Sequence, residues 1–192
     1  SGARLKKLGV PGEEAFFGRG VSQCADCDAG FFVSQKVVVV GGGDSALQEA
    51  LHLAEYASDI VLVTRGNGLR ARQSYVNRAA KNPKFSFRWE TEVSEVFGGD
   101  GVEKVRLTPT GGGDGEDLDC KGVFVFVGLE PNAEFLPPEI ERDDGGFVKT
   151  DTSFKSSVDG VHAVGAVRAG YSGQLASAAG EAASIVAMLP TD

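Results

Sequence analysis

The stretch KVVVVGGGDSA, residues 36–46, constrains the fold of this chain more than any other part of its sequence. Its four consecutive valines, Val37 to Val40, are too apolar for a strand that faces water, so we expect a strand inside a sheet that is covered on both faces. Gly41 and Gly43 follow at once, and Ala46 fills the third small position of the pattern G-x-G-x-x-G/A. In this pattern the glycines let bare backbone approach a phosphate, and the third small residue lets a helix pack on the strand.

A helix is expected directly after the glycines. In DSALQEALHLAE, residues 44–55, apolar residues recur at helical spacing with good helix formers between them. The order of strand, glycine turn and helix N-terminus predicts a site for a dinucleotide phosphate, and a purely structural turn is the alternative. The predicted contacts are Gly41, Gly42, Gly43, Asp44, Ser45 and Ala46.

Composition excludes several classes of protein. The chain has 192 residues, 42% of them hydrophobic and 24% charged, which is typical of a globular protein with one or two lobes. A net charge of -8 argues against a nucleic-acid partner, since phosphate binding needs an excess of Lys and Arg. No apolar run approaches the roughly 20 residues of a membrane span, and the opening SGARLKKLG lacks the apolar core of a secretory signal. We therefore expect a soluble, cytoplasmic protein.

Three cysteines are present, and two of them form the pattern Cys-x-x-Cys. Cys24 and Cys27 are spaced so that a disulfide or a dithiol can form with little backbone rearrangement. Cys120 stands alone beside an apolar run, which predicts a small packing residue. A zinc site is not expected, because there is one Cys-x-x-Cys and the two histidines, His52 and His162, have no paired spacing. We interpret both histidines as structural and predict no metal.

The end of the second expected strand, residues 60–63, bears on the choice of cofactor. A carboxylate there would bind the ribose hydroxyls of NAD, whereas arginine accommodates the 2′-phosphate of NADP. Thr64, Arg65 and Arg70 follow this strand, and no carboxylate does. The sequence therefore favours NADPH over NADH. Arg72 is also nearby and fits a solvated helix start.

The remaining segments complete an α/β pattern. A helix is expected at 73–81, ending before Asn82-Pro83. Alternating residues predict a β-meander of three strands, and apolar runs predict three later strands and a close-packed C-terminal helix. These segments are 85–90, 91–97 and 102–110 for the meander, then 122–128, 147–149, 161–164 and the helix 173–189.

Together these residues resemble the low-molecular-weight thioredoxin reductases, which are flavoprotein members of the pyridine nucleotide-disulfide oxidoreductases. The resemblance covers nearly the whole chain. The motifs that carry it, in chain order, are G-A-R-x-x-x-L-G-V-P-G-E-E, C-A-x-C-D, G-G-G-D-S-A, an Arg-bearing strand end, G-x-E-P-N, and G-V-x-A-x-G-x-V with Gln174 downstream.

The resemblance implies an α/β fold with two domains. Residues 1–7 resemble a connector, and residues 8–125 resemble a three-layer, Rossmann-like NAD(P)H-binding domain with a β-meander and the Cys-x-x-Cys motif. Residues 126–192 resemble the C-terminal part of an FAD-binding domain. The N-terminal part of that domain, with a second G-x-G-x-x-G, has no counterpart in this sequence, so we expect a fragment, or one piece of a divided enzyme, that is inactive alone.

The resemblance also implies a chemistry: electrons pass from NADPH through FAD to the cysteine pair, and then to thioredoxin or another disulfide substrate. By this resemblance Cys27 faces the flavin, Cys24 attacks the substrate and Asp28 acts as acid and base. It further implies a homodimer. The residues that it assigns to the flavin domain are Gly128, Gly165, Ala166 and Gln174.

Two departures from the family pattern, together with one added charge, leave alternatives open. Ala166 stands where the family usually has an Asp that binds the flavin, and Thr64-Arg65-Gly66 replaces His-Arg-Arg. Asp26, between the cysteines, adds a negative charge that opposes thiolate formation. One alternative is an NADP(H)-binding module or subunit without dithiol catalysis. Another is a flavin oxidoreductase that acts on a small molecule with idle cysteines.

Overall fold

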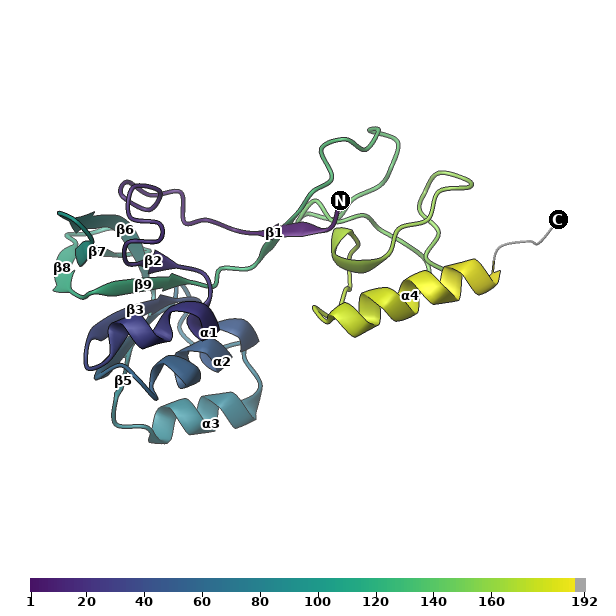
Figure 1. Ribbon diagram of the computed structural model, residues 1–192. Coiled ribbons are helices and arrows are strands. Elements are labelled where there is room, and N and C mark those ends of the chain that lie inside the picture. The colour runs from purple at the N-terminus through teal and green to yellow at the C-terminus, as the bar shows by residue number, and fades with distance from the viewer. Residues whose placement is uncertain (189–192) are drawn as a thin grey trace. The chain divides into compact units, whose positions relative to one another are not determined.

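The computed structural model describes residues 1–188, and these form two compact units (Figure 1). Unit 1 consists of Ser1–Leu5 together with the chain from Gly128 onward, and unit 2 is Lys6–Val127. Unit 2 contains both the glycine turn and the Cys-x-x-Cys motif.

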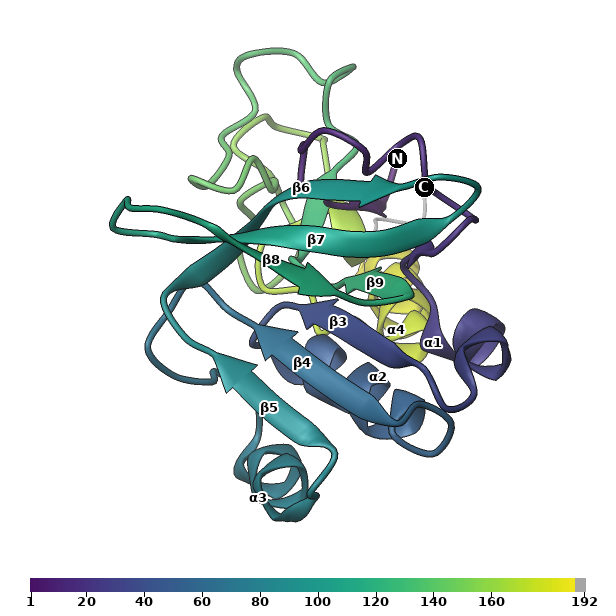
Figure 2. The same cartoon turned by 90° about the vertical axis from the view of Figure 1, so that its left-hand side faces the viewer.

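The centre of unit 2 is a five-stranded parallel sheet with the order β2-β9-β3-β4-β5, of which Figure 2 shows β9, β3, β4 and β5 in sequence. The strand of valines lies in the middle and pairs on both sides, Val38 with Val61 and with Val123. The strands are β2 (Val21–Ser22), β9 (Gly122–Val125), β3 (Lys36–Val40), β4 (Asp59–Val63) and β5 (Phe85–Arg88).

Helices cover one face of this sheet (Figure 1). They are α1 (Ala25–Asp28), continued by the 3-10 turn η1 (Ala29–Phe32), α2 (Asp44–Leu53) and α3 (Gln73–Lys81). Leu47 and Leu53 of α2 pack with Val37 and Val39 of β3 in one apolar cluster. The predicted helices at 44–55 and 73–81 are confirmed, and the first ends two residues earlier.

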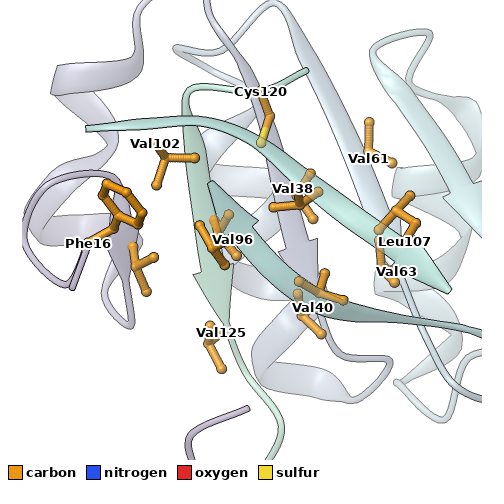
Figure 3. Packing of buried hydrophobic residues seen from close by; sticks show 14 residues of the cluster. Phe16, Val38, Val40, Val61, Val63, Val96, Val102, Leu107, Cys120 and Val125 are labelled. Carbon is orange, nitrogen blue, oxygen red and sulfur yellow. The ribbon is translucent and has the colours of Figure 1, made fainter. Parts of the chain in front are cut away.

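An antiparallel sheet of β6 (Thr91–Gly98), β7 (Val102–Pro109) and β8 (Glu116–Asp119) covers the other face. Val38 and Val40 point into this second cluster and meet residues such as Val96 and Leu107 (Figure 3). Alternate valines of β3 thus face opposite layers, and all four are buried. The expected three-layer α/β fold is confirmed.

One strand of the predicted meander belongs elsewhere. Phe85–Arg88 pairs with β4 as the edge strand of the parallel sheet, and the meander consists of the next three strands. The reason is topological: α3 crosses over the sheet and returns the chain beside β4, in the manner of a strand-helix-strand unit.

Unit 1 holds little regular structure. Its elements are β1 (Ala3–Leu5) paired with β10 (Leu129–Pro131), the 3-10 turn η2 (Gly165–Val167) and α4 (Leu175–Met188). A small core joins Ala133, Ile140, Val148 and Val167.

Two predictions for unit 1 are wrong. Residues 147–149 and 161–164 make isolated bridges instead of strands: Val148 bridges to Arg142 and to Arg168, and His162 bridges to Lys155. The C-terminal helix forms, but none of its described residues is buried, so it is not close-packed within this chain. Leu189, the last residue of the predicted helix, lies outside the described residues. No helix within residues 1–188 combines the length and the apolar composition of a membrane span.

Candidate nucleotide and disulfide sites

The turn between β3 and α2 has a backbone that requires glycine. Gly41 has a φ of 140°, and a Cβ built on it would overlap the carbonyl oxygen of Phe126. Its N–H donates to the carbonyl of Val63 at 2.9 Å. A Cβ on Gly42 would lie 3.0 Å from Oγ1 of Thr64. The turn is therefore packed tightly between the ends of two neighbouring strands.

The N-terminus of α2, in contrast, is open. Gly43 is its N-cap, and no side chain caps the helix there. A Cβ on Gly43 would meet no atom within 4 Å. The first N–H groups of a helix have no partner inside the helix and carry a partial positive charge. Ala46 is buried beneath this turn and Ser45 is exposed at it. This cradle fits a phosphate of a dinucleotide.

Backbone contacts hold the arginine-bearing loop against the glycine turn. The N–H of Arg70 donates to the carbonyl of Gly42 at 2.8 Å. Arg72 is bound twice to Asp44: its N–H donates to Oδ1 at 2.7 Å, and its Nε lies 3.0 Å from Oδ2. Arg72 thus ties the loop to the start of α2, a role that its sequence position did not reveal.

Two arginines of the loop that follows β4 have no ion-pair partner among the described residues. Arg65 and Arg70 are exposed, and neither forms an ion pair with any residue in the described part of the chain. Thr64 lies between them and the strand end. Free guanidiniums beside an open helix N-terminus suit the extra phosphate of NADPH. Of the predicted residues, Thr64 and Arg70 therefore lie against Gly42 of the glycine turn, and Arg65 follows Thr64 in the chain.

Cys24 and Cys27 form a disulfide at the surface of unit 2, with a Cα–Cα distance of 5.3 Å. Cys24 is the N-cap of α1, and its sulfur accepts a hydrogen bond from the N–H of Cys27 at 3.2 Å. Cys27 is exposed, whereas Cys24 is half-buried. The short helix thus presents one sulfur to solvent and gives the other a hydrogen-bond donor.

Asp28 is held by a serine that sequence reasoning missed. The hydroxyl of Ser22, in β2, donates to Oδ2 of Asp28 at 2.6 Å and accepts from the N–H of Cys24 at 3.1 Å. Ser22 is 5% exposed. A serine two residues before the first cysteine, in a stretch that becomes a buried strand, was the available signal.

A pocket of about 410 Å³ adjoins the disulfide site. Ser22 and Asp28 contribute to its wall, as do Arg19 and Lys121. Phe31, also on the wall, is 81% exposed. Asp28 therefore borders a space that solvent can enter, and an exposed aromatic ring lies at its edge.

Helix α2 connects the two sites. It begins at the glycine turn, and in its middle Glu49 accepts a hydrogen bond from the N–H of Ala25, the first residue of α1, at 2.8 Å. One turn later Nε2 of His52 lies 3.4 Å from Oδ1 of Asp26. His52, which we interpreted as structural, thus faces the negative charge between the cysteines. The nucleotide cradle thus lies at the start of α2, and the helix that carries the disulfide, α1, contacts the middle of α2.

The residues assigned to the flavin lie in unit 1. The N–H of Gly165 donates to Oε2 of Glu181 at 2.7 Å. Arg168 pairs with the same carboxylate, and its hydrogen bond holds the pKa of Glu181 below its usual range. Gln174 precedes α4 and accepts at its carbonyl from Tyr171. Gly128 begins the segment that returns to unit 1.

Two of these unit 1 residues, Gly165 and Ala166, offer a flavin few polar groups. Ala166 has no polar side chain, and the neighbouring N–H of Gly165 is already bonded.

Within residues 1–188, no group of three or more His, Cys, Asp and Glu side chains is arranged to hold a metal ion.

Comparison with known families tests the resemblance that the sequence motifs predict. The family model of pyridine nucleotide-disulphide oxidoreductases matches residues 1–183. The chain belongs to this family. The resemblance expected from its motifs is therefore confirmed.

Several relatives and solved structures that this chain is similar to are thioredoxin reductases. That of Mycolicibacterium smegmatis is 45% identical over 166 residues, which are 85% of this chain and 53% of the relative. That of Listeria innocua is 42% identical over 183 residues, or 94% and 57%. The crystal structure from Lactococcus lactis matches with a TM-score of 0.88 and 36% identity, over 98% of this chain and 62% of that one. The chain spans about half the length of the curated relatives it matches.

Proposed function

We propose that this chain supplies the NADPH-binding and dithiol parts of an NADPH-dependent flavoprotein disulfide reductase of the thioredoxin reductase type. One observation carries the proposal: the open N-terminus of α2 and the Cys24–Cys27 disulfide are joined through a single helix. A nucleotide site at the start of α2 and a redox disulfide on α1, which is hydrogen-bonded to α2, are the two protein parts that such a reductase requires.

The two units then have different duties. Unit 2 is the NAD(P)H-binding domain with its redox pair, and unit 1 is part of an FAD-binding domain that residues outside this sequence complete. When bound, FAD supplies the two-electron transfer between nicotinamide and disulfide. The thioredoxin reductases among the relatives support a thioredoxin-like protein disulfide as substrate. The exposed ring of Phe31 beside the pocket offers such a partner an apolar contact.

The residues of unit 2 account for the thiol chemistry. After reduction, the Cys24 thiolate, stabilised by the N–H of Cys27, attacks the substrate disulfide and forms a mixed disulfide. Cys27 then attacks Cys24, which restores the internal disulfide and releases the second substrate thiol. Two electrons and two protons leave the dithiol, and we assign to Asp28, which follows Cys27 in the chain and borders the open pocket, the transfer of a proton to the departing sulfur.

Binding of NADPH to a Gly43→Ala variant tests the nucleotide site. The fold has room for the added methyl group, so we expect an unchanged melting temperature. A phosphate in the cradle would meet that methyl group, so the Kd for NADPH, measured by calorimetry, should rise by about tenfold or more, on the order of 1.4 kcal/mol. Gly111→Ala is the control, since Gly111 is equally unobstructed in the β7–β8 hairpin. Equal affinity of both variants would contradict the site.

Cofactor preference is tested at Arg70. We expect Arg70→Gln to weaken NADPH binding by about tenfold to a hundredfold, the value of one charged hydrogen bond, and to leave NADH binding unchanged. Arg78→Gln, an exposed arginine in α3, should change neither affinity. An equal loss for NADPH and NADH would refute a contact with the 2′-phosphate.

An NADP(H)-binding module without dithiol catalysis is the second candidate, and Ala166 favours it. It requires that the reduced Cys24–Cys27 pair does not reduce disulfides. Incubating the reduced chain with oxidised thioredoxin and counting the thiols that appear separates the two: release of thioredoxin thiols supports the reductase, and their absence supports the module.

A further inference from the structure

Ser22 has more than a packing role, because a single buried hydroxyl contacts both parts of the disulfide site. Its oxygen lies 2.6 Å from Oδ2 of Asp28, 3.1 Å from the nitrogen of Cys24 and 3.4 Å from the carbonyl oxygen of Cys24. A serine hydroxyl has one proton to donate. The much shorter contact shows that this proton goes to the carboxylate, which is also the stronger acceptor.

The position of this hydroxyl is fixed by the sheet. Ser22 lies in β2, where it pairs with Phe124 of β9, and the preceding Val21 is 1% exposed. Asp28, in contrast, is the last residue of a four-residue helix and borders the pocket. A carboxylate in that place can adopt several rotamers unless a fixed donor selects one. Ser22 is such a donor.

We propose that Ser22 is a positioning residue of the disulfide reaction: its hydroxyl holds the Asp28 carboxylate beside the cysteine pair in the orientation that serves proton transfer. The inference rests on the disulfide reductase function proposed above. The same hydroxyl accepts a hydrogen bond from the N–H of Cys24. One oxygen atom therefore contacts both the backbone of the attacking cysteine and the acid-base group.

The proton inventory of the reaction explains why this position matters. The dithiol and a substrate disulfide give the internal disulfide and two substrate thiols, so each departing sulfur ends with a proton. A substrate thiolate of low basicity, as in an aromatic disulfide, leaves without help. An alkyl thiolate is more basic and leaves faster when an acid protonates it. Asp28 and its positioning residue should therefore matter for alkyl disulfides and little for aromatic ones.

The test uses the whole chain, reduced and freed of reductant, in single-turnover reactions with an alkyl disulfide (oxidised glutathione) and with an aromatic disulfide that releases a coloured thiolate. For Ser22→Ala we expect the rate with glutathione disulfide to fall by about tenfold, because Asp28 then loses part of its effect as a general acid. With the aromatic disulfide the rate should change by less than about twofold. Equal slowing with both substrates would mean a merely structural role and would overturn the inference.

A double-mutant cycle sharpens the result. If Ser22 acts through Asp28, the double variant Ser22→Ala with Asp28→Asn reacts with glutathione disulfide at the rate of Asp28→Asn alone. If the double variant is instead slowed by the product of the two single-variant effects, the two residues act independently and the inference is overturned. Ser94→Ala is the control, because Ser94 in β6 is half-buried and, like Ser22, lies in a strand with its hydroxyl hydrogen-bonded to a side chain, that of Thr108 at 2.8 Å. It should react as the wild type does.

An isosteric pair covers the case in which Ser22→Ala does not fold. Ser22→Thr keeps the hydroxyl, and Ser22→Val replaces it with a methyl group of the same shape. We expect the threonine variant to react with glutathione disulfide faster than the valine variant by about tenfold, and equal rates would overturn the inference. A wild-type chain that reduces neither disulfide would refute the proposed function itself, whereas a normal wild type with a normal Ser22→Ala refutes the role of Ser22 alone.

Discussion

At the scale of the residue, Cys120 differs from Cys24 and Cys27 in the properties that control thiol reactivity. It is 3% exposed and packs among valines on the β6–β7–β8 side of the sheet (Figure 3). Burial raises the pKa of its thiol from 9.0 to about 12. The thiolate, which is the reactive form, is therefore scarce at neutral pH.

This difference predicts selective alkylation. In the reduced native protein at pH 8, iodoacetamide should modify Cys24 and Cys27 and spare Cys120, as counted by intact mass. Unfolding in urea should expose the third thiol. Since the unfolded thiol loses its proton near 9.0 and the folded one near about 12, the unfolded state binds fewer protons between these values. The free energy of unfolding should fall over this pH window. Rapid labelling of native Cys120 at pH 8 would contradict the assignment.

Residues differ in how far their roles can be predicted from sequence. The requirement for glycine at Gly41 follows from a local pattern, because strand, turn and helix are contiguous in the chain. Ser22 and Arg72 could not be assigned in this way. Their partners, Asp28 and Asp44, are defined by which rotamers meet after the sheet and helices have packed.

At the scale of the element, α2 contributes to both candidate sites, the nucleotide cradle and the disulfide. Its first residue follows the nucleotide cradle, and Glu49 in its middle binds the start of α1, where Ala25 is fully buried. The sequence predicted this helix and its apolar face, but not that its polar face carries the redox helix. Helical periodicity reports burial, whereas a single side-chain contact to a distant backbone leaves no periodic signal.

The contact between these helices gives a prediction. Glu49→Leu leaves the buried N–H of Ala25 without a partner, so the free energy of unfolding in urea should fall by about 1–3 kcal/mol. Hydrogen exchange at Ala25 should quicken as α1 loosens. Glu49→Gln retains an acceptor oxygen and should lose much less. Similar losses for the two variants would mean that the carboxylate charge, and not the hydrogen bond, holds α1.

Sheet membership was the least predictable property of the elements. The valines of β3 identified a buried central strand correctly, since an apolar run of this kind has no exposed alternative. Phe85–Arg88 alternates like a meander strand, yet it joins the parallel sheet. Alternation describes the two faces of a strand and not its neighbours, which depend on contacts between residues far apart in the chain.

At the scale of the whole molecule, each apolar core lies within a single unit. The two large clusters lie entirely within Lys6–Val127, and the small cluster of Ala133, Ile140, Val148 and Val167 lies in unit 1. A unit with its own core can fold alone. We expect residues 6–127, expressed separately, to melt cooperatively, to form the Cys24–Cys27 disulfide and to bind NADPH as the full chain does. A fragment that is unfolded by circular dichroism would show that unit 2 depends on unit 1.

The ribbon of β1 and β10 has a consequence for how such a molecule can arise. Leu5 pairs with Leu129, and unit 2 begins at Lys6 and ends at Val127. Facing Cα atoms of antiparallel strands lie about 4.5–5.5 Å apart, a gap that a two-residue hairpin turn can close. Unit 1 could therefore exist with a short turn in place of unit 2. The ribbon is a junction at which a unit with its own core, such as unit 2, can be inserted into or removed from another domain while that domain keeps the path of its chain.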